Sequence, residues 1–225
     1  MASKDNKTRL DRTQIVQAAL AMADTAGLES LTMRSLGRSL GVEAMSLYNH
    51  VANKEDLLDA MVDAVFSEMA VPEPTDPWRA ALTERSHSTR TVLRKHSWAT
   101  PLLDSRTSPG PATLRHQDST IGCLRNSGFS IGATAHAMAL VDAYVYGFAI
   151  QEAALPFEGP EETADVTEAI VQQMSPETYP HLVEMATDHV LLPGYDFAHE
   201  FDFGLELILD GLSAIGPDRD TSPVG

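Results

Sequence analysis

The 225-residue sequence contains a single cysteine, Cys123. One thiol cannot form a disulfide within the chain or a thiolate cage around a metal, so both kinds of site are excluded and a reducing compartment is indicated. No run reaches the roughly 18 apolar residues that span a bilayer. The polar first ten residues lack the apolar stretch of a signal peptide. We therefore expect a cytoplasmic protein with no membrane partner.

The common motifs of catalysis are also missing. The sequence has no nucleophile elbow, no phosphate-binding glycine loop, no HExxH helix and no acid pair embedded in a motif. His181, His189 and His199 do not share a spacing typical of metal ligands. We expect neither an enzyme nor a resident cofactor or metal.

Basic residues are scarce and unevenly placed. The formal net charge is -16, yet residues 1–54 hold seven Lys and Arg against five Asp and Glu, a net charge of +2. The rest of the chain carries -18, and no Lys or Arg lies between Arg125 and Arg219. Since phosphate attraction supplies most sequence-independent affinity for nucleic acid, the amino-terminal segment could approach a duplex while the remainder would be repelled.

The chain has a strong helical periodicity. From Ile15 onward apolar residues recur at helical spacing, and the runs begin near side chains that cap helices. The first predicted helix follows Asp11, whose partner in a capping box is Gln14, and ends at Gly27. Further helices are predicted from Thr32 to Gly41, over about 43–50, and from Asn53 to about 69.

A segment with three prolines, 71–77, is the predicted domain junction. Beyond it, helical patterns cover about 77–95, 108–127, 131–155 and 196–215, with a shorter helix from Ser175. Ser108 and Ser130 are the predicted caps of the second and third of these helices. The acidic, Pro- and Gly-flanked segment 156–173 has no predicted helix. No alternating strand pattern is present, so we predict an all-α fold with domains at 1–70 and 71–216 and a loose tail at 217–225.

Two short helices meet at Gly41, which can take the left-handed backbone of a tight interhelical turn. Leu36, Leu40, Val42, Leu47 and Val51 would face the core. The residues left to protrude from the second helix suit a DNA major groove, where hydroxyl and imidazole groups can bond bases or phosphates and apolar groups can touch thymine methyls. These residues are Ala44, Met45, Ser46, Tyr48, Asn49 and His50.

Two cations flank this pair of helices. Arg34 lies in the first turn of the preceding helix and could donate two hydrogen bonds to a guanine. Lys54 lies at the amino end of the next helix and could bind a phosphate. The alternative is a simple packing corner, because two short helices joined at a glycine are common. The amphipathic first helix and the turn sequence together favour a helix-turn-helix that binds DNA.

Residues 10–66 resemble the tetracycline-repressor (TetR) family. The stretches LDRTQIVQAALAMADTAG, LTMRSLGRSLGVEAMSLYNHV and NKEDLLDAM carry the likeness. Later, VDAYVYGFAI and FDFGLELILDGL look like the tetracycline-repressor class itself. The resemblance implies a three-helix DNA-binding domain, a connecting fourth helix, and a larger helical domain that binds a small-molecule effector and dimerises through a four-helix bundle. Repression is the family's usual mode of action.

The family's DNA contacts carry over by position. The resemblance assigns phosphate contacts to Thr32, Tyr48 and Lys54, and groove-lining or base-reading positions to Arg34, Ala44, Met45, Ser46 and His50. Tetracycline repressors have a glutamine-proline pair where Ala44 and Met45 stand, so a different operator is expected.

The family's tetracycline and magnesium contacts do not carry over. The two histidines of that site align with Ala70 and Leu102, the asparagine falls near Arg85, and the glutamate falls near Gln151. A hard cation needs oxygen or imidazole ligands, so the effector is expected to be another, largely hydrophobic molecule.

The second domain offers apolar and aromatic residues for such a pocket, although most of them could equally be ordinary core. The predicted lining is Trp98, Leu102, His136, Tyr144, Phe148, Met174 and Tyr179. Helical stripes on 131–155 and 196–215 are predicted to form the homodimer seam, with burial inside one subunit as the alternative. They comprise Val141, Val145, Phe201, Leu205, Ile208 and Leu212, with Gly204 and Gly211 allowing close approach.

Two-fold pairing would place the recognition helices about one DNA turn apart, roughly 34 Å, and so demands a palindromic double-stranded operator. One competing interpretation remains open. The recognition helix contains no Lys or Arg, so the chain could be a helical interaction module whose helix-turn-helix no longer binds DNA.

Overall fold

The structure is a computed structural model that describes residues 10–156 and 160–216. The described residues form helices and turns without a strand, which confirms the predicted all-α class. The chain separates into two compact units, Met1–Ser127 and Gly128–Gly225. The predicted junction at residue 71 lies inside the first unit, and as a functional boundary it stays a prediction. The predicted tail at 217–225 lies outside the described residues.

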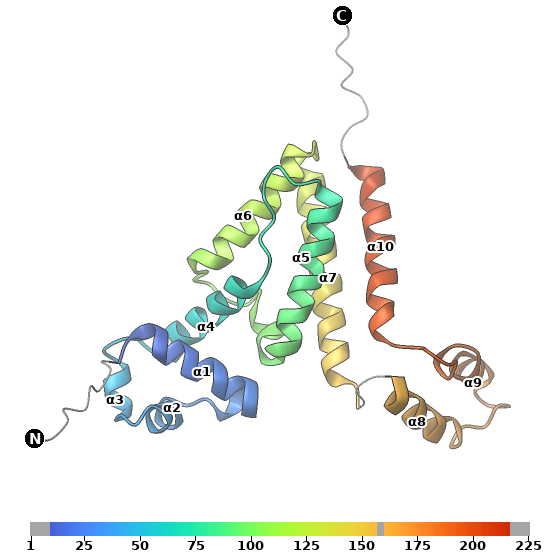
Figure 1. The fold of residues 1–225 in the computed structure, drawn as a ribbon, viewed down its shortest axis with the longest axis horizontal. Coiled ribbons are helices and arrows are strands. Elements are labelled where there is room, and N and C mark those ends of the chain that lie inside the picture. Colours follow the sequence, from blue (N-terminus) through green and yellow to red (C-terminus); the bar gives the residue numbers. More distant parts are fainter. Residues whose placement is uncertain (1–9, 157–159, 217–225) are drawn as a thin grey trace, which may run out of the picture. The chain divides into compact units, whose positions relative to one another are not determined.

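The first unit begins with four helices in the blue-to-cyan part of Figure 1 and continues with two more. Its helices are α1 (Arg12–Ala26), α2 (Met33–Ser39), α3 (Ala44–Leu47), α4 (Lys54–Glu68), α5 (Trp78–Lys95) and α6 (Pro111–Asn126), with the short 3-10 segments η1 (Leu28–Ser30) and η2 (Ser97–Leu102). The predicted caps of the first helices are confirmed. Asp11 and Gln14 form a capping box, and Thr32 and Asn53 cap α2 and α4.

Helix α4 is the centre of this unit because it packs against both α1 and α6. Its apolar face is fully buried and includes Leu57, Met61 and Val65. Helix α1 contributes Ile15 and Ala19 to the same core. The apolar residues of α4 therefore face inward, as their 3.6-residue period requires.

Helix α6 begins later than predicted. Ser108 was expected to cap it, but Pro111 is its first residue and Gly110 is the capping position. The reason is a cap supplied from another helix: the Asp63 carboxylate of α4 accepts hydrogen bonds from the Thr113 backbone N–H (2.8 Å) and hydroxyl (3.0 Å). A carboxylate at a helix amino terminus satisfies a free amide and complements the helix dipole. A Cβ at Gly110 would lie 2.3 Å from this carboxylate, so the position requires glycine.

The second unit contains α7 (Ile131–Ala154), α8 (Pro160–Val171), α9 (Pro180–Met185), a π-helical segment (Ala186–Val190) and α10 (Ala198–Ile215). Helix α7 starts at the predicted cap, Ser130. The prediction of no helix within 156–173 is wrong, because α8 lies there. The short helix predicted from Ser175 begins instead at Pro180. Acidic composition favoured a loop, whereas the apolar Val166 and Ile170 follow helical spacing.

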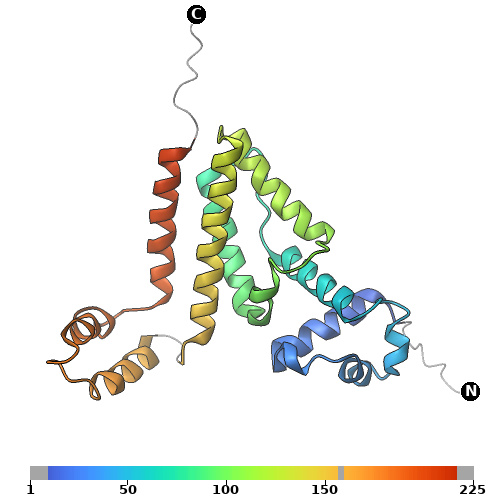
Figure 2. The same cartoon turned by 180° about the vertical axis from the view of Figure 1, so that it is seen from behind.

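Helices α7 and α10 run antiparallel and side by side (Figure 2). Tyr144 of α7 donates its hydroxyl hydrogen toward the backbone oxygens of Glu200 and Phe201, each 3.0 Å away. Its ring stacks on Phe201, with centroids 5.6 Å apart. A Cβ at Gly204 would lie 2.2 Å from the Tyr144 hydroxyl, so this glycine permits close packing within one chain.

The same packing covers most of the predicted dimer seam, whose role in dimerisation stays a prediction. Five of its six residues are buried inside the chain, so they have no surface to offer a second one: Val141, Val145, Phe201, Leu205 and Leu212. Ile208 is half-buried. Both helices have two apolar faces, and a helical period alone does not tell which face packs internally.

By length and composition, α7 is the one helix among the described residues that could cross a membrane. Val141, Val145 and Ala149 are buried on its inner face. Its packing against α10 accounts for the apolar residues of that face, as in a core helix.

We predict that Gly204→Ala destabilises the fold by about 1–2 kcal/mol, because the new methyl group would displace the Tyr144 hydroxyl from its two backbone acceptors. Urea-induced unfolding of the purified chain measures this. Gly132→Ala is the matched control, since its Cβ would meet only the Ser130 Oγ at 4.0 Å. Equal stability of the two variants would contradict the role given to Gly204.

Candidate nucleic-acid interface

The turn between α2 and α3 has the geometry that a helix-turn-helix needs. Gly41 adopts φ 67°, a left-handed conformation that side-chain-bearing residues rarely take. At Gly37 a Cβ would lie 3.0 Å from the Val42 carbonyl oxygen, so α2 and the turn are in close contact. Leu36 and Leu47 are fully buried and hold the two helices together.

One face of α3 and the turn after it is open to solvent. Met45 is 75% exposed and Tyr48 is 43% exposed. Asn49 is exposed as well, whereas Ala44, Ser46 and His50 are half-buried at the edge of this face. The structure therefore brings the predicted groove-facing residues of α3 together on one accessible surface.

The flanking positions are also accessible. Thr32 is exposed at the start of α2, where its hydroxyl accepts a hydrogen bond from the Ser35 N–H (3.0 Å). Arg34 and Lys54 are exposed, and neither forms an ion pair with another described residue. Both cations are thus available to a phosphate or a base.

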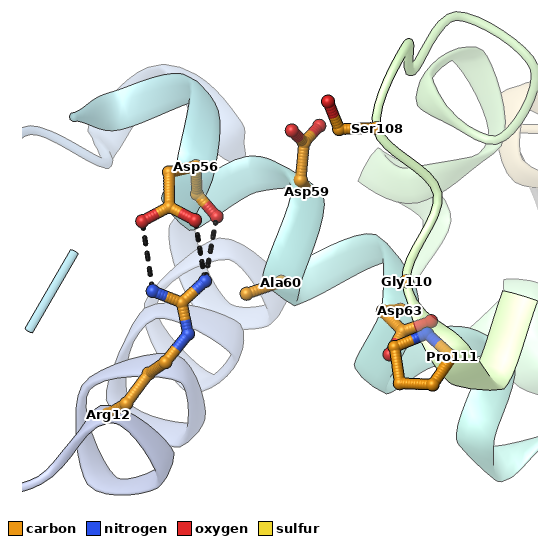
Figure 3. A pocket seen from close by; sticks show the side chains of 8 residues that line it. All are labelled: Arg12, Asp56, Asp59, Ala60, Asp63, Ser108, Gly110 and Pro111. Carbon is orange, nitrogen blue, oxygen red and sulfur yellow. Dashed lines mark hydrogen bonds and ion pairs between the residues drawn. The ribbon is translucent and has the colours of Figure 1, made fainter. Parts of the chain in front are cut away.

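Sequence reasoning missed Arg12, which fixes the end of this surface. Its guanidinium donates to both carboxylate oxygens of Asp56 (2.6 and 2.9 Å) and to the His50 carbonyl oxygen (2.9 Å). Asp56 also accepts from the Ala52 N–H at 2.7 Å. One ion pair therefore joins α1, the turn after α3 and the start of α4, as Figure 3 shows for Arg12 and Asp56. A bidentate pair of this kind imposes a definite geometry.

The hydrogen bond from Arg12 is the main reason that the pKa of the Asp56 carboxyl is lowered to about 2, and the Ala52 N–H adds to the effect. The carboxylate is therefore ionised throughout the physiological pH range.

A pocket of about 260 Å³ lies beside this ion pair. Three carboxylates, Asp56, Asp59 and Asp63, line it together with Arg12, Ala60, Ser108, Gly110 and Pro111 (Figure 3). The negative charge of the pocket would repel a phosphate, so the pocket differs in this respect from the exposed surface of α3. Neither here nor at any other place among the described residues are three His, Cys, Asp or Glu side chains placed to hold a metal ion.

A second polar cluster joins α1 to the end of α5. Asp24 accepts hydrogen bonds at one oxygen from the Trp98 indole N–H (2.7 Å) and from His96 Nδ1 (2.6 Å). The other ring nitrogen of His96 lies 3.3 Å from Glu68 at the end of α4, which also pairs with Lys95 (2.7 Å). We call these five residues the Asp24 cluster.

The residues predicted to line an effector pocket are distributed over both compact units. In the first unit Trp98 is buried and bonded to Asp24, and Leu102 is half-buried. In the second unit Tyr144 and Phe148 are neighbours, with ring centroids 6.1 Å apart. Met174 is half-buried, while His136 and Tyr179 are exposed. Their joint role in a pocket stays a prediction.

Comparisons with known proteins agree with this architecture. Residues 15–61 match the family described as "Bacterial regulatory proteins, tetR family", and residues 71–215 match "Tetracyclin repressor-like, C-terminal domain". The HTH-type transcriptional repressor DrrR1 of Streptomyces coeruleorubidus is 31% identical, over 96% of this chain and 82% of that protein. The class A tetracycline repressor of Escherichia coli is also 31% identical, over 92% of each chain.

Among solved structures, Streptomyces coelicolor ActR in complex with (S)-DNPA superposes with a TM-score of 0.75 at 29% identity. The match covers 91% of this chain and 98% of that one. ActR has also been crystallised with actinorhodin.

We predict that Asp56→Ala lowers the unfolding free energy at pH 7 by about 2 kcal/mol, since the Arg12 ion pair and its backbone bonds are lost. The pKa of an unfolded aspartate is near 3.9. The Asp56 contribution should therefore be complete above about pH 4 and decline as pH falls toward the folded-state pKa of about 2.

Urea unfolding at pH 7 and at pH 3 tests this, with Glu29→Ala as an exposed control that removes the same charge. A gap between variant and wild type that stays constant over this range would exclude the predicted linkage.

Proposed function

Because the chain belongs to the tetR family of bacterial transcriptional regulators, we propose that it binds a palindromic operator as a homodimer and leaves it when a small organic effector binds. The exposed face of α3 is the observation that carries the proposal. The apolar side chain of Met45 on α3 lies beside hydrogen-bonding groups of Tyr48 and Asn49 in the turn that follows, and a helix of this kind can enter a major groove.

Charge supports this placement of the DNA. The segment 1–54 has a net charge of +2 and the rest of the chain -18. Arg34 and Lys54 flank α3 and can hold phosphates on either side of the groove. The same distribution disfavours a second nucleic-acid surface in the carboxy-terminal half.

A homodimer is supported by the apolar side chains that α7 and α10 leave uncovered. On α10, Phe203 (66% exposed), Leu207 (58% exposed) and Ile215 stand four or eight residues apart with the exposed Gly211 between them. On α7, Leu140 and Ile150 are exposed. Large exposed apolar residues in a row mark an interaction surface, and two such helices from each chain can form a four-helix bundle. These residues replace the originally predicted seam.

Ligand complexes of a similar protein support an effector. ActR was crystallised with (S)-DNPA and with actinorhodin. The predicted apolar lining favours a largely hydrophobic effector here, and the altered tetracycline positions disfavour a magnesium complex. We place the protein in the cytoplasm and assign it no enzymatic activity.

Release would act through α4. This helix contacts the DNA-binding helix α1 on one side and α6 on the other. An effector that prefers one position of α4 would change the distance between the two α3 helices of a dimer and so lower operator affinity. A helical interaction module that lacks DNA affinity is the competing function.

We predict that Arg34→Ala and Tyr48→Phe each weaken operator binding by about 1–3 kcal/mol, because each removes a contact to a base edge or a phosphate. Mobility-shift assays on duplexes enriched from a random pool by the wild-type protein measure this. Arg115→Ala, an exposed cation on α6, is the charge-matched control and should bind normally. If no duplex is enriched, the interaction-module interpretation replaces the regulator.

We predict that Phe203→Glu converts the dimer to a monomer, because a carboxylate would be buried without a partner in the four-helix bundle. Sedimentation velocity should show half the wild-type mass, and operator binding should fall in parallel. Leu114→Glu places the same charge on an exposed leucine of α6 and should remain dimeric. A dimeric Phe203→Glu protein would show that α10 does not form the seam.

A further inference from the structure

An exposed carboxylate lies immediately before the recognition helix α3. It belongs to Glu43, whose side chain forms no hydrogen bond or ion pair with another described residue and does not cap the helix. Other acids of the DNA-binding helices have structural partners: Asp11 caps α1, and Asp24 accepts a hydrogen bond from Trp98. Neither capping nor ion pairing accounts for Glu43, so we looked for a group outside the chain that its carboxylate could bind.

The backbone on both sides of Glu43 is fixed. The Val42 N–H donates to the Gly37 carbonyl oxygen, and the Ser46 N–H donates to the Glu43 carbonyl oxygen, each at 2.9 Å. A Cβ at Gly37 would lie 3.1 Å from the Ala44 nitrogen, so α2 packs closely against the start of α3. The carboxylate can therefore reach only a limited region in front of α3, and a side chain that recognises one base needs such a defined position.

The position of Glu43 places it at the groove in the proposed complex. A recognition helix contacts base edges mainly through its amino-terminal residues. Glu43 directly precedes the first of these, Ala44, and the exposed Met45 follows. The carboxylate would lie close to phosphates that repel it. It would thus lower the affinity for DNA unless a base donates a hydrogen bond to it.

The major-groove edges of the bases differ in what they offer to a carboxylate. The polar groups of guanine and thymine are acceptors only, and these repel it. Adenine presents an amino donor, but the N7 acceptor lies next to it. Cytosine presents the N4 amino group as its only polar group. Cytosine is therefore the base whose edge a carboxylate fits best.

We propose that Glu43 determines operator specificity by accepting a hydrogen bond from the N4 amino group of a cytosine in each half-site. The carboxylate also rejects guanine and thymine at this position, because two acceptors would face one another without a hydrogen between them. This inference deepens the proposed function and rests on it, since Glu43 can contact a base only if α3 enters a major groove.

Selection of duplexes from a random pool by the wild-type protein, Glu43→Gln and Glu43→Ala tests this. The first two consensus sequences should differ at one position of each half-site, with cytosine for the wild type and adenine for Glu43→Gln, because an amide can bond adenine N6 and N7 together. Replacing this cytosine by thymine should weaken wild-type binding about tenfold, as one mismatched base pair commonly does. Glu43→Ala should bind all four bases there about equally.

Glu29→Gln is the matched control, since it removes the same charge from another exposed residue near α2, and it should keep the cytosine. Identical consensus sequences for the wild type and both Glu43 variants would overturn the role of Glu43 while leaving operator binding intact. A wild-type base other than cytosine at the altered position would also overturn it, as would the same alteration in Glu29→Gln. If the wild-type protein enriches no duplex, operator binding fails and this inference fails with it.

Discussion

The structure of the first unit depends on how the acidic side chains of α4 are paired. Near its start, Asp56 pairs with Arg12 of α1, and Glu55 and Asp59 both pair with Arg106 at 2.6 Å. Further along, Asp63 caps α6 and Glu68 pairs with Lys95 of α5. The opposite face of the helix is apolar and buried. Each ion pair is partly exposed and individually weak, but a series of them along one helix fixes its rotation and its position between two neighbours.

This arrangement ties the helix-turn-helix to α4 at two separate points. Arg12 connects the start of α1 to the start of α4, and the Asp24 cluster connects the end of α1 to η2 and to the end of α4. With both ends of α1 held, the three DNA-binding helices should move with α4 as one body. We call α1, α2 and α3 together the DNA-binding head. A displacement at α6, where His116 contacts Phe66 of α4, would then rotate the whole head, including α3, as a rigid body.

Features with local causes were predictable from the sequence, and features with distant causes were not. The caps Asp11, Thr32, Asn53 and Ser130 each accept a hydrogen bond from the amide three residues later, so they could be identified from the sequence. The start of α6 was missed because its cap comes from Asp63, fifty residues earlier. Exposure of Met45 and Tyr48 followed from the helical period of the apolar residues around them. Arg12, Asp24 and His116 have roles that depend on tertiary neighbours, and no spacing rule reveals them.

The charge distribution fits the proposed homodimer better than a monomer that binds DNA alone. Arg12 is neutralised by Asp56, which leaves few cations near α3 among the residues that the structure describes. Counterion release from a single head would then be small. When two heads are linked, binding of the first raises the effective concentration of the second at its own site, which increases affinity. This increase in affinity is lost once the separation of the heads no longer matches the operator. In the proposed homodimer, a weakly basic head would therefore make binding sensitive to the spacing that α4 is proposed to set. A strongly basic head would hold DNA at the wrong spacing as well, and a small rotation of α4 would then change little.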